Sequence, residues 1–241
     1  MRPASTGHGV QRSARRGVCA LLLLIASCTA LAAEPAPATS ADTRQRLERH
    51  LQEHPEDSKA QLELAQHLHD AAVAGESKAA TKASSLLRSL LAQNPTNAVA
   101  RAYLGSALTL QARDAVLPTT KLSLAREGFR EMDTAALQAP DVIPVRLVRA
   151  MNGIAVPKMF NRNKLALEDF AWIHGQPLRE GEYGGRLMRQ RVALEYGRLL
   201  ARLKNTDKAR EVWQAGVGFD PASDSDIAKS LRRELETAGK P

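Results

Sequence analysis

The segment His50-Leu51-Gln52-Glu53-His54 has the residue types and spacing that most directly suggest catalysis. On a helix this spacing permits two histidines to bind zinc on one face, with the glutamate as general base for a metal-bound water. Pro55 follows at once and ends a helix there. A zinc hydrolase using His50, Glu53 and His54 is therefore our least favoured hypothesis, and we expect no catalytic residue, metal or cofactor.

A stripe of arginines offers a different chemistry. Arg191, Arg198 and Arg202 recur at spacings of seven and four, so they lie on one face of a helix. Paired N–H donors on such a face could bind a carboxylate or phosphate. Glu195 could instead pair with its neighbours, at only about 0.2–0.5 kcal/mol per pair. The stripe is thus either a ligand site or a solvated face.

Two further basic segments, Arg113–Lys121 and Val156–Lys164, interrupt the helical pattern and are expected to be loops inserted within hairpins. In a stack of hairpins such loops fall along one edge, so we expect them to be neighbours. Binding groups concentrate in loops on a rigid scaffold, although the prolines and apolar residues could merely pack these turns down. The candidate binding residues of this loop edge are Arg113, Lys121, Lys158, Phe160 and Arg162.

The N-terminus has the features of an export signal. A basic region is followed by the apolar stretch Val18–Ile25 and by the small-residue site Ala30-Leu31-Ala32. We expect a signal peptide over residues 1–32 and a periplasmic protein. The alternative is a lipoprotein signal over residues 1–27, with a lipid on Cys28 and an outer-membrane anchor; secretion is a further possibility.

Processing also changes the composition. Neither cleavage leaves a cysteine pair, which excludes disulfides, thiolate catalysis and cysteine metal sites. Removing the four arginines of the leader reduces the net charge from +8 to +4. With nine aromatic residues and an exported product, nucleic-acid binding is disfavoured. Residues 33–41, rich in Pro, Ala and Ser, are expected to form a flexible spacer.

The elements that must position these side chains are helices. From Asp42 onward, apolar residues recur at three and four residues, and alternating β-branched runs are absent. Prolines follow the helical segments at intervals of 37 to 45 residues, each long enough for two helices with their turns. These prolines are Pro55, Pro95, Pro140, Pro177 and Pro221.

Two windows resemble the tetratricopeptide repeat (TPR) family. Asn94-Pro95-Thr96-Asn97 is followed by small and apolar residues at TPR positions, and Gln190–Pro221 matches one whole repeat. The intervals exceed the 34 residues usual in the family, and Arg101 and Ala193 stand at its early tryptophan position. The residues expected to pack or end the repeats are Gly105, Gly128, Ala150, Gly197, Ala209, Trp213, Pro95, Pro140 and Pro221.

The resemblance implies an all-α fold, an α-solenoid of three to four antiparallel hairpins over residues 42–239, with a C-terminal capping helix over residues 224–238. It also implies a non-catalytic scaffold that holds a protein or peptide partner of the cell envelope in a groove. A module for an anionic envelope polymer or lipid headgroup is the alternative. The expected groove residues are Ala102, Ser106, Thr109, Leu147, Met151, Arg191, Arg198 and Arg202.

Overall fold

A computed structural model describes residues 39–76, 78–177 and 185–238, and it is all-helical over these residues. The expected signal peptide, Cys28 and most of the expected spacer lie outside the described residues. The helices are α1 (Ser40–Glu53), α2 (Ser58–Val73), α3 (Ala79–Gln93), α4 (Ala98–Asp114), α5 (Pro118–Gln138), α6 (Ile143–Ala155), the short 3₁₀ helix η1 (Lys158–Phe160), α7 (Asn163–Gly175), α8 (Arg186–Arg202), α9 (Thr206–Gly218) and α10 (Asp226–Ala238). Within the described part of the chain, none is both long and apolar enough to cross a membrane.

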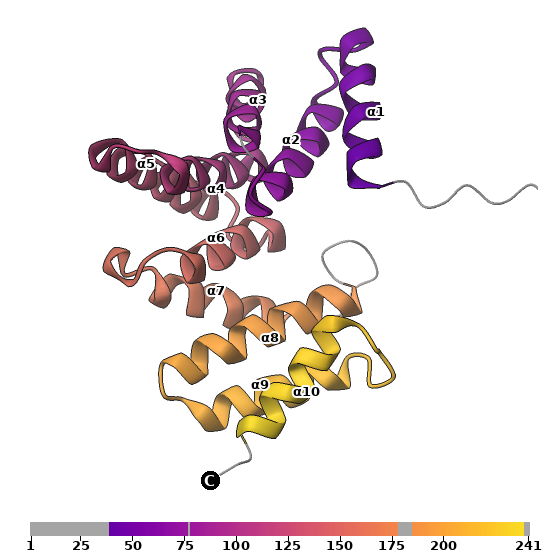
Figure 1. Cartoon of the computed structure of the whole chain (residues 1–241), viewed down its shortest axis with the longest axis vertical. Coiled ribbons are helices and arrows are strands. Elements are labelled where there is room, and N and C mark those ends of the chain that lie inside the picture. Colours follow the sequence, from indigo (N-terminus) through magenta and orange to yellow (C-terminus); the bar gives the residue numbers. More distant parts are fainter. Residues whose placement is uncertain (1–38, 77, 178–184, 239–241) are drawn as a thin grey trace, which may run out of the picture. The chain divides into compact units, whose positions relative to one another are not determined.

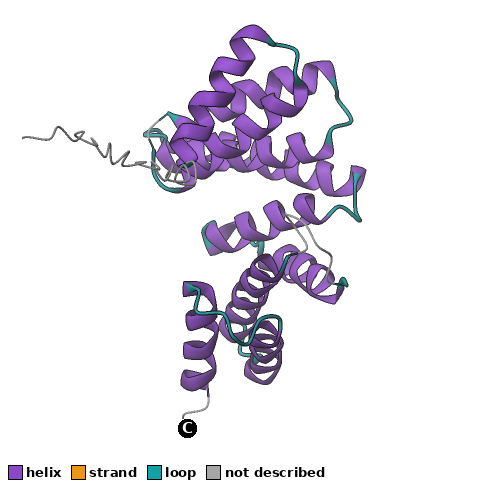
Figure 2. Cartoon of the chain, turned by 90° about the vertical axis from the view of Figure 1, so that its right-hand side faces the viewer, coloured by secondary structure: helices purple, strands orange, loops and turns teal. Residues whose placement is uncertain are grey.

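The helices pair in chain order, as Figure 1 shows. The most extensive contacts join α2 with α3, α4 with α5, α6 with α7, and α8 with α9. Each hairpin then packs on the next, with α1 on the first hairpin and α10 on the last (Figure 2). The prediction of an α-solenoid of antiparallel hairpins with a capping helix is confirmed, and the described residues form four hairpins.

The prolines mark the joints between hairpins. Four prolines each lie two residues after the end of a helix: Pro55 after α1, Pro95 after α3, Pro140 after α5 and Pro177 after α7. The same turn recurs around Pro55, Pro95, Pro140 and Pro221. In each, the backbone N–H two residues after the proline donates to the carbonyl of the residue before it, at 3.2–3.3 Å. Proline suits the second position of such a turn because its φ is already fixed.

A side chain six residues after the proline stabilises three of these turns. Gln61 donates to the carbonyl of Pro55 at 2.5 Å and Arg101 to that of Pro95 at 2.9 Å. Arg146 donates to Pro140 in the same way. Arg101 also forms an ion pair with Glu131 of α5 at 2.7 Å. At the position where the TPR pattern has a tryptophan, this chain therefore has an arginine that links α4 to α5.

Small residues let the paired helices approach closely. A Cβ on Gly105 of α4 would lie 2.5 Å from the Gly128 carbonyl oxygen of α5, and a Cβ on Gly128 would be equally close to Gly105. In the last hairpin, a Cβ on Gly197 would overlap the indole ring of Trp213. The Nε1 of that ring donates to the Leu194 carbonyl of α8 at 3.2 Å. These contacts place Trp213 inside its own hairpin, between α8 and α9.

The capping helix α10 covers the last hairpin with one face. Leu231 is fully buried, and Ile227 and Leu235 pack against the same core. On the other side of that core, Arg189 donates to the carbonyls of Ile173 and His174 at the end of α7, at 2.9 and 3.1 Å. Its guanidinium thereby binds carbonyls of the last turn of α7, one of which, that of Ile173, also accepts from the Gln176 N–H at 3.1 Å.

Several element boundaries differ from the sequence predictions. The segment Arg113–Lys121 is mostly helical, because α4 continues to Asp114 and α5 begins at Pro118. Proline is favoured at the first position of a helix, where its missing N–H costs nothing. At the other boundary, Thr39 and Asp42 form a reciprocal cap on α1, so the end of the expected spacer belongs to the first helix.

The close approach of α4 and α5 predicts an unusual response to Gly105→Ala. In most helices alanine stabilises relative to glycine by about 0.5–1 kcal/mol. Here we expect the free energy of unfolding to fall by about 1–3 kcal/mol, because the new methyl group would overlap the α5 backbone. The control is Gly175→Ala, where a Cβ would contact nothing within 4 Å. Urea denaturation measures both, and equal stabilities for the two variants would contradict the prediction.

His174 predicts a pH effect on stability. Its pKa is lowered below the ordinary 6.5, mainly because burial desolvates the charged ring and also because Arg189 and Lys208 repel it. The unfolded chain takes up a proton near pH 6.5 and the folded chain only at lower pH, so stability falls as the pH drops below about 6.5. We expect His174→Leu to lose less stability than the wild type between about pH 7.5 and 5.5, as measured by denaturant unfolding. If the wild type and His174→Leu lose the same stability over this pH range, the proposed role of His174 is wrong.

Candidate functional site

A large cavity among the described residues lies between the first helices of successive hairpins. Its volume is about 1310 Å³, and it is lined by residues of α2, α4, α5, α6 and α8 and by the α6–α7 connection. We refer to it as the groove cavity. Its lining includes His69, Val73, Ser106, Thr109, Lys121, Leu122, Met151, Asn152, Met159, Met188 and Arg191.

The lining of the groove cavity is largely apolar and partly open to solvent. Val73, Leu122 and Met159 are exposed by 57%, 36% and 80%, which is unusual for large apolar side chains at one site. Met151, Met159 and Met188 all contribute. Methionine is flexible and polarizable, so it adapts to partners of different shape. This surface is suited to cover the apolar side chains of another molecule.

A row of polar side chains crosses this apolar lining. His69 of α2 lies with Nε2 2.8 Å from the Ser106 hydroxyl of α4. One turn further along α4, the Thr109 hydroxyl donates to the Ser106 carbonyl at 2.7 Å and accepts from Nδ2 of Asn152 in α6 at 2.5 Å. The row therefore joins three hairpins, and all four residues line the groove cavity.

The basic residues of the two expected loops have different roles. Arg113 pairs with Asp114 at 2.7 Å and donates to the Ala72 carbonyl of α2 at 3.0 Å. This pairing raises the pKa of Arg113, and the Arg113 guanidinium lowers the pKa of Asp114. Lys121 donates to the Arg113 carbonyl at 3.1 Å and has no carboxylate within 4 Å among the described residues. Arg113 is thus a structural tie, whereas Lys121 leaves a positive charge at the cavity.

Arg162 belongs to a partly buried ion-pair network. Its guanidinium binds Asp133 with both Nη atoms, at 2.8 and 2.6 Å. Arg149 contacts Asp133 at 3.5 Å and binds Asp169, which is fully buried, at 2.7 and 2.8 Å. The Asp169 carboxylate raises the pKa of Arg149. Arg146 completes the network on Asp169 at 2.8 Å, so these cations hold α5, α6 and α7 together and Arg162 is not available to a partner.

Of the other two loop-edge residues, one lines the groove cavity and one faces solvent. Phe160 packs edge-on against Phe129 with ring centroids 5.1 Å apart, and it also lines the groove cavity. Lys158 is exposed and lies outside its lining. Arg113, Lys121 and Phe160 therefore line one cavity, so the two segments are neighbours, although the first is mostly helix.

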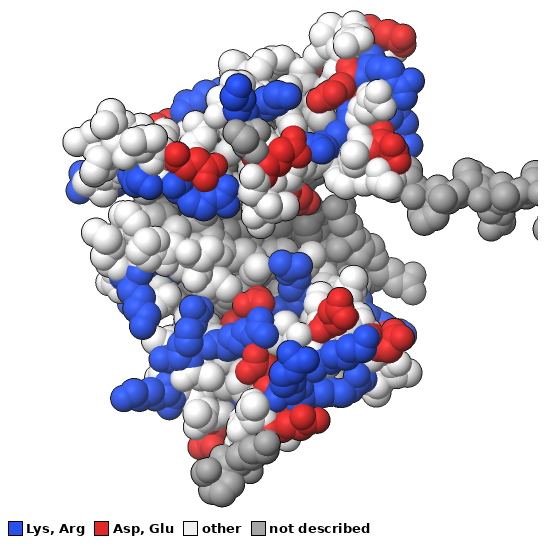
Figure 3. Space-filling view, in the orientation of Figure 1, with Lys and Arg blue, Asp and Glu red and all other residues white. Residues whose placement is uncertain are grey.

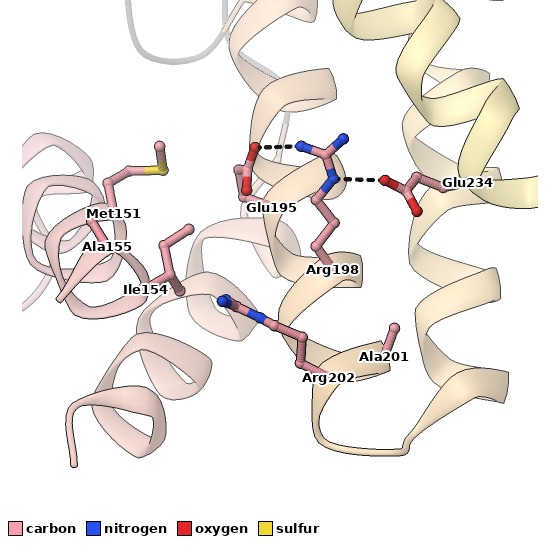
Figure 4. A pocket seen from close by; sticks show the side chains of 8 residues that line it. All are labelled: Met151, Ile154, Ala155, Glu195, Arg198, Ala201, Arg202 and Glu234. Atoms are coloured by element: carbon pink, nitrogen blue, oxygen red, sulfur yellow. Dashed lines mark hydrogen bonds and ion pairs between the residues drawn. The ribbon is translucent and has the colours of Figure 1, made fainter. Parts of the chain in front are cut away.

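The arginine stripe of α8 is divided between two cavities. Arg191 lines the groove cavity, is exposed, and has no hydrogen bond or ion pair among the described residues. Arg198 and Arg202 line a smaller cavity of about 510 Å³ between α6 and α8 (Figure 4). There Arg198 bridges Glu195 at 3.1 Å and Glu234 of α10 at 2.7 Å.

Arg198 therefore links α8 to the capping helix α10. Figure 4 shows Arg202 pointing toward Ile154 of α6, and it forms no ion pair within the described part of the chain. Lys and Arg gather over α8 to α10 in the lower half of Figure 3, with Asp and Glu among them. The surface there is mixed in sign and does not form a single cationic patch.

The His-x-x-Glu-His segment forms the end of α1. His50 Nε2 lies 2.9 Å from Asp57, and the rings of His50 and His54 are 4.8 Å apart. Two backbone N–H donors and the His50 contact lower the pKa of Asp57, which caps α2. Across the described residues, no three His, Cys, Asp or Glu side chains are grouped so that they could hold a metal.

The groove cavity brings together Ser106, Thr109, Leu147, Met151 and Arg191 of the predicted groove. Ala102 instead lies fully buried in a core cluster with Phe129 and Met132. Sequence reasoning missed His69, Asn152 and Met188. A signal for Asn152 exists, since it is a polar residue on the inward face of a helix that is otherwise apolar at those positions.

No family model matches the sequence, and no curated protein matches it. Among solved structures, this chain is similar to a thermophilic TPR protein from Thermus thermophilus. The two share 16% sequence identity with a TM-score of 0.62, over 83% of this chain and 90% of that one. At this identity the similarity concerns the fold alone. The chain therefore has a TPR-like α-solenoid fold.

Proposed function

We propose that the chain is a non-catalytic scaffold of the bacterial cell envelope that holds an apolar segment of a partner protein in the groove cavity. The observation that carries this proposal is the cavity of about 1310 Å³ whose lining leaves Val73 and Met159 mostly exposed. Covering such side chains is worth about 25 cal/mol per Å² of apolar surface. The TPR-like fold supports a protein partner, because helical-repeat folds present extended binding surfaces of this kind.

A site for an anionic polymer or lipid headgroup is less well supported. Of the cations that would form it, Arg113 and Arg162 are already paired with Asp114 and Asp133. Exposed cations are interspersed with acidic side chains in Figure 3. A zinc hydrolase is not proposed, because His50 is engaged by the cap residue Asp57.

The location is proposed from the leader. We expect the mature protein to begin at Ala33 and to be periplasmic. Intact-mass analysis of the protein purified from the envelope fraction tests this, since cleavage before Ala33 and lipidation of Cys28 give different masses. A full-length mass with Met1 retained would overturn export.

The groove proposal predicts that added charge at the cavity mouth abolishes partner binding. The test variant is Val73→Glu with Met159→Glu, and the control is Leu137→Glu with Leu203→Glu. The control positions are exposed by 83% and 46% and lie outside both cavities. Both variants add two negative charges at exposed apolar sites, so only their position distinguishes them.

The measurement is cross-linked capture from envelope fractions with the purified chain, quantified by mass spectrometry. We expect a partner recovered by the wild type and by the control, and reduced at least about tenfold with the cavity variant, because burying one large apolar side chain is worth about 1.5–3 kcal/mol. Circular dichroism checks that all three proteins are folded. Equal recovery by the cavity variant and the control would show that the groove cavity is not the binding site.

A further inference from the structure

One polar side chain that lines the groove cavity has an atom without a hydrogen-bond partner among the described residues. Asn152 is only 8% exposed, and its buried Oδ1 accepts no hydrogen bond from the described part of the chain. Four buried side-chain N or O atoms lack partners in the described part of the chain, on Gln61, Asn152, His174 and Arg189. Of these residues, Asn152 is the one that lines the groove cavity.

The orientation of the Asn152 amide follows from its neighbours. The Thr109 hydroxyl uses its proton to donate to the Ser106 carbonyl, so toward Asn152 it must accept. The amide nitrogen therefore faces Thr109, which leaves the amide oxygen as the group without a partner. An unpaired buried acceptor costs free energy that a donor from outside the chain would recover.

The charges at the cavity point to the rest of the occupant. Arg191 has no hydrogen bond or ion pair among the described residues, and Lys121 has no carboxylate within 4 Å there. Asp70 is the one acidic residue among the described residues of the lining, and it lies 3.2 Å from His69. The lining thus carries an excess of positive charge, which an acidic side chain on the occupant would complement.

We propose that the groove cavity selects an apolar protein segment that brings a hydrogen-bond donor to Asn152 and an acidic side chain to Arg191. This inference rests on the proposed function and names the chemistry of the partner. An occupant without the donor would cover Asn152 and leave its oxygen unpaired. Asn152 then determines specificity, while the apolar lining supplies most of the affinity.

The test uses a library of random peptides, about 12 residues long so that an extended chain can span the cavity, displayed on phage and selected on the purified chain. Selected sequences are synthesised and titrated by calorimetry against the wild type, Asn152→Leu and Arg191→Gln. Each peptide is also made with its donor side chain replaced by an apolar one of similar size, and with its acidic residue replaced by the amide. Thermal unfolding of each protein variant checks its fold.

We expect the selected peptides to be apolar with a shared donor and a shared acidic residue. Removing the donor should weaken binding about tenfold on the wild type and much less on Asn152→Leu. Replacing the acidic residue of the peptide should likewise weaken its binding to the wild type but not its binding to Arg191→Gln. The peptide changes on wild-type protein retain their meaning even if a protein variant fails to fold.

Two kinds of failure are distinguishable. If peptides bind and Val73→Glu with Met159→Glu abolishes their binding, but donor removal costs nothing or costs the same on Asn152→Leu, the role of Asn152 is overturned while the groove proposal stands. An acidic residue whose removal has no effect overturns the role of Arg191. If no selected peptide depends on the cavity residues, the groove proposal itself fails, and this inference fails with it.

Discussion

The close approach of the paired helices governs how the hairpins form and stack. Gly105 and Gly128 bring the α4 and α5 backbones so near that no Cβ fits between them, and Gly197 makes room for Trp213 in the last hairpin. A hairpin packed this tightly behaves as one unit, and an internal hairpin packs on the hairpin before it and on the one after it. Successive hairpins must then cover one another, and the stack ends only where a helix such as α10 presents a polar back.

Most of the arginines discussed above serve this stacking. Arg101 and Arg146 hold the proline turns, Arg149 and Arg162 join three helices through Asp133 and Asp169, and Arg189 binds the end of α7. A guanidinium suits these positions because its planar fork binds carboxylates and carbonyls through several donors at once. Arg191 and Arg202 stand apart from this use, and Arg191 lies beside the groove cavity. In this chain, most of these arginines therefore form ion pairs and hydrogen bonds within the protein and are not free to bind an anionic ligand.

Sequence patterns were most reliable where one residue type has one physical consequence. Prolines marked the joints because proline cannot continue a helix, and the apolar spacing predicted helices because no strand shares that period. The same reasoning failed at Pro118, which begins α5 and does not interrupt a loop. Proline is compatible with a turn and with the first residue of a helix, and local sequence does not separate the two. Ala102 was misplaced because its neighbours in the core, Phe129 and Met132, lie far away in sequence.

By itself, the sequence determined the class of fold, the joints and the small residues at helix contacts, because these follow from backbone restrictions that act over a few residues. The tertiary structure alone decided which polar groups find partners. Arg162 meets Asp133 across 29 positions and Asn152 meets Thr109 across 43, and the Oδ1 of Asn152 has no partner among the described residues. A hydrogen bond forms only when the distance between donor and acceptor, here on side chains from different hairpins, is right to within a few tenths of an ångström. No local pattern encodes such distances, so the chemistry of the groove cavity emerges only from the stacking.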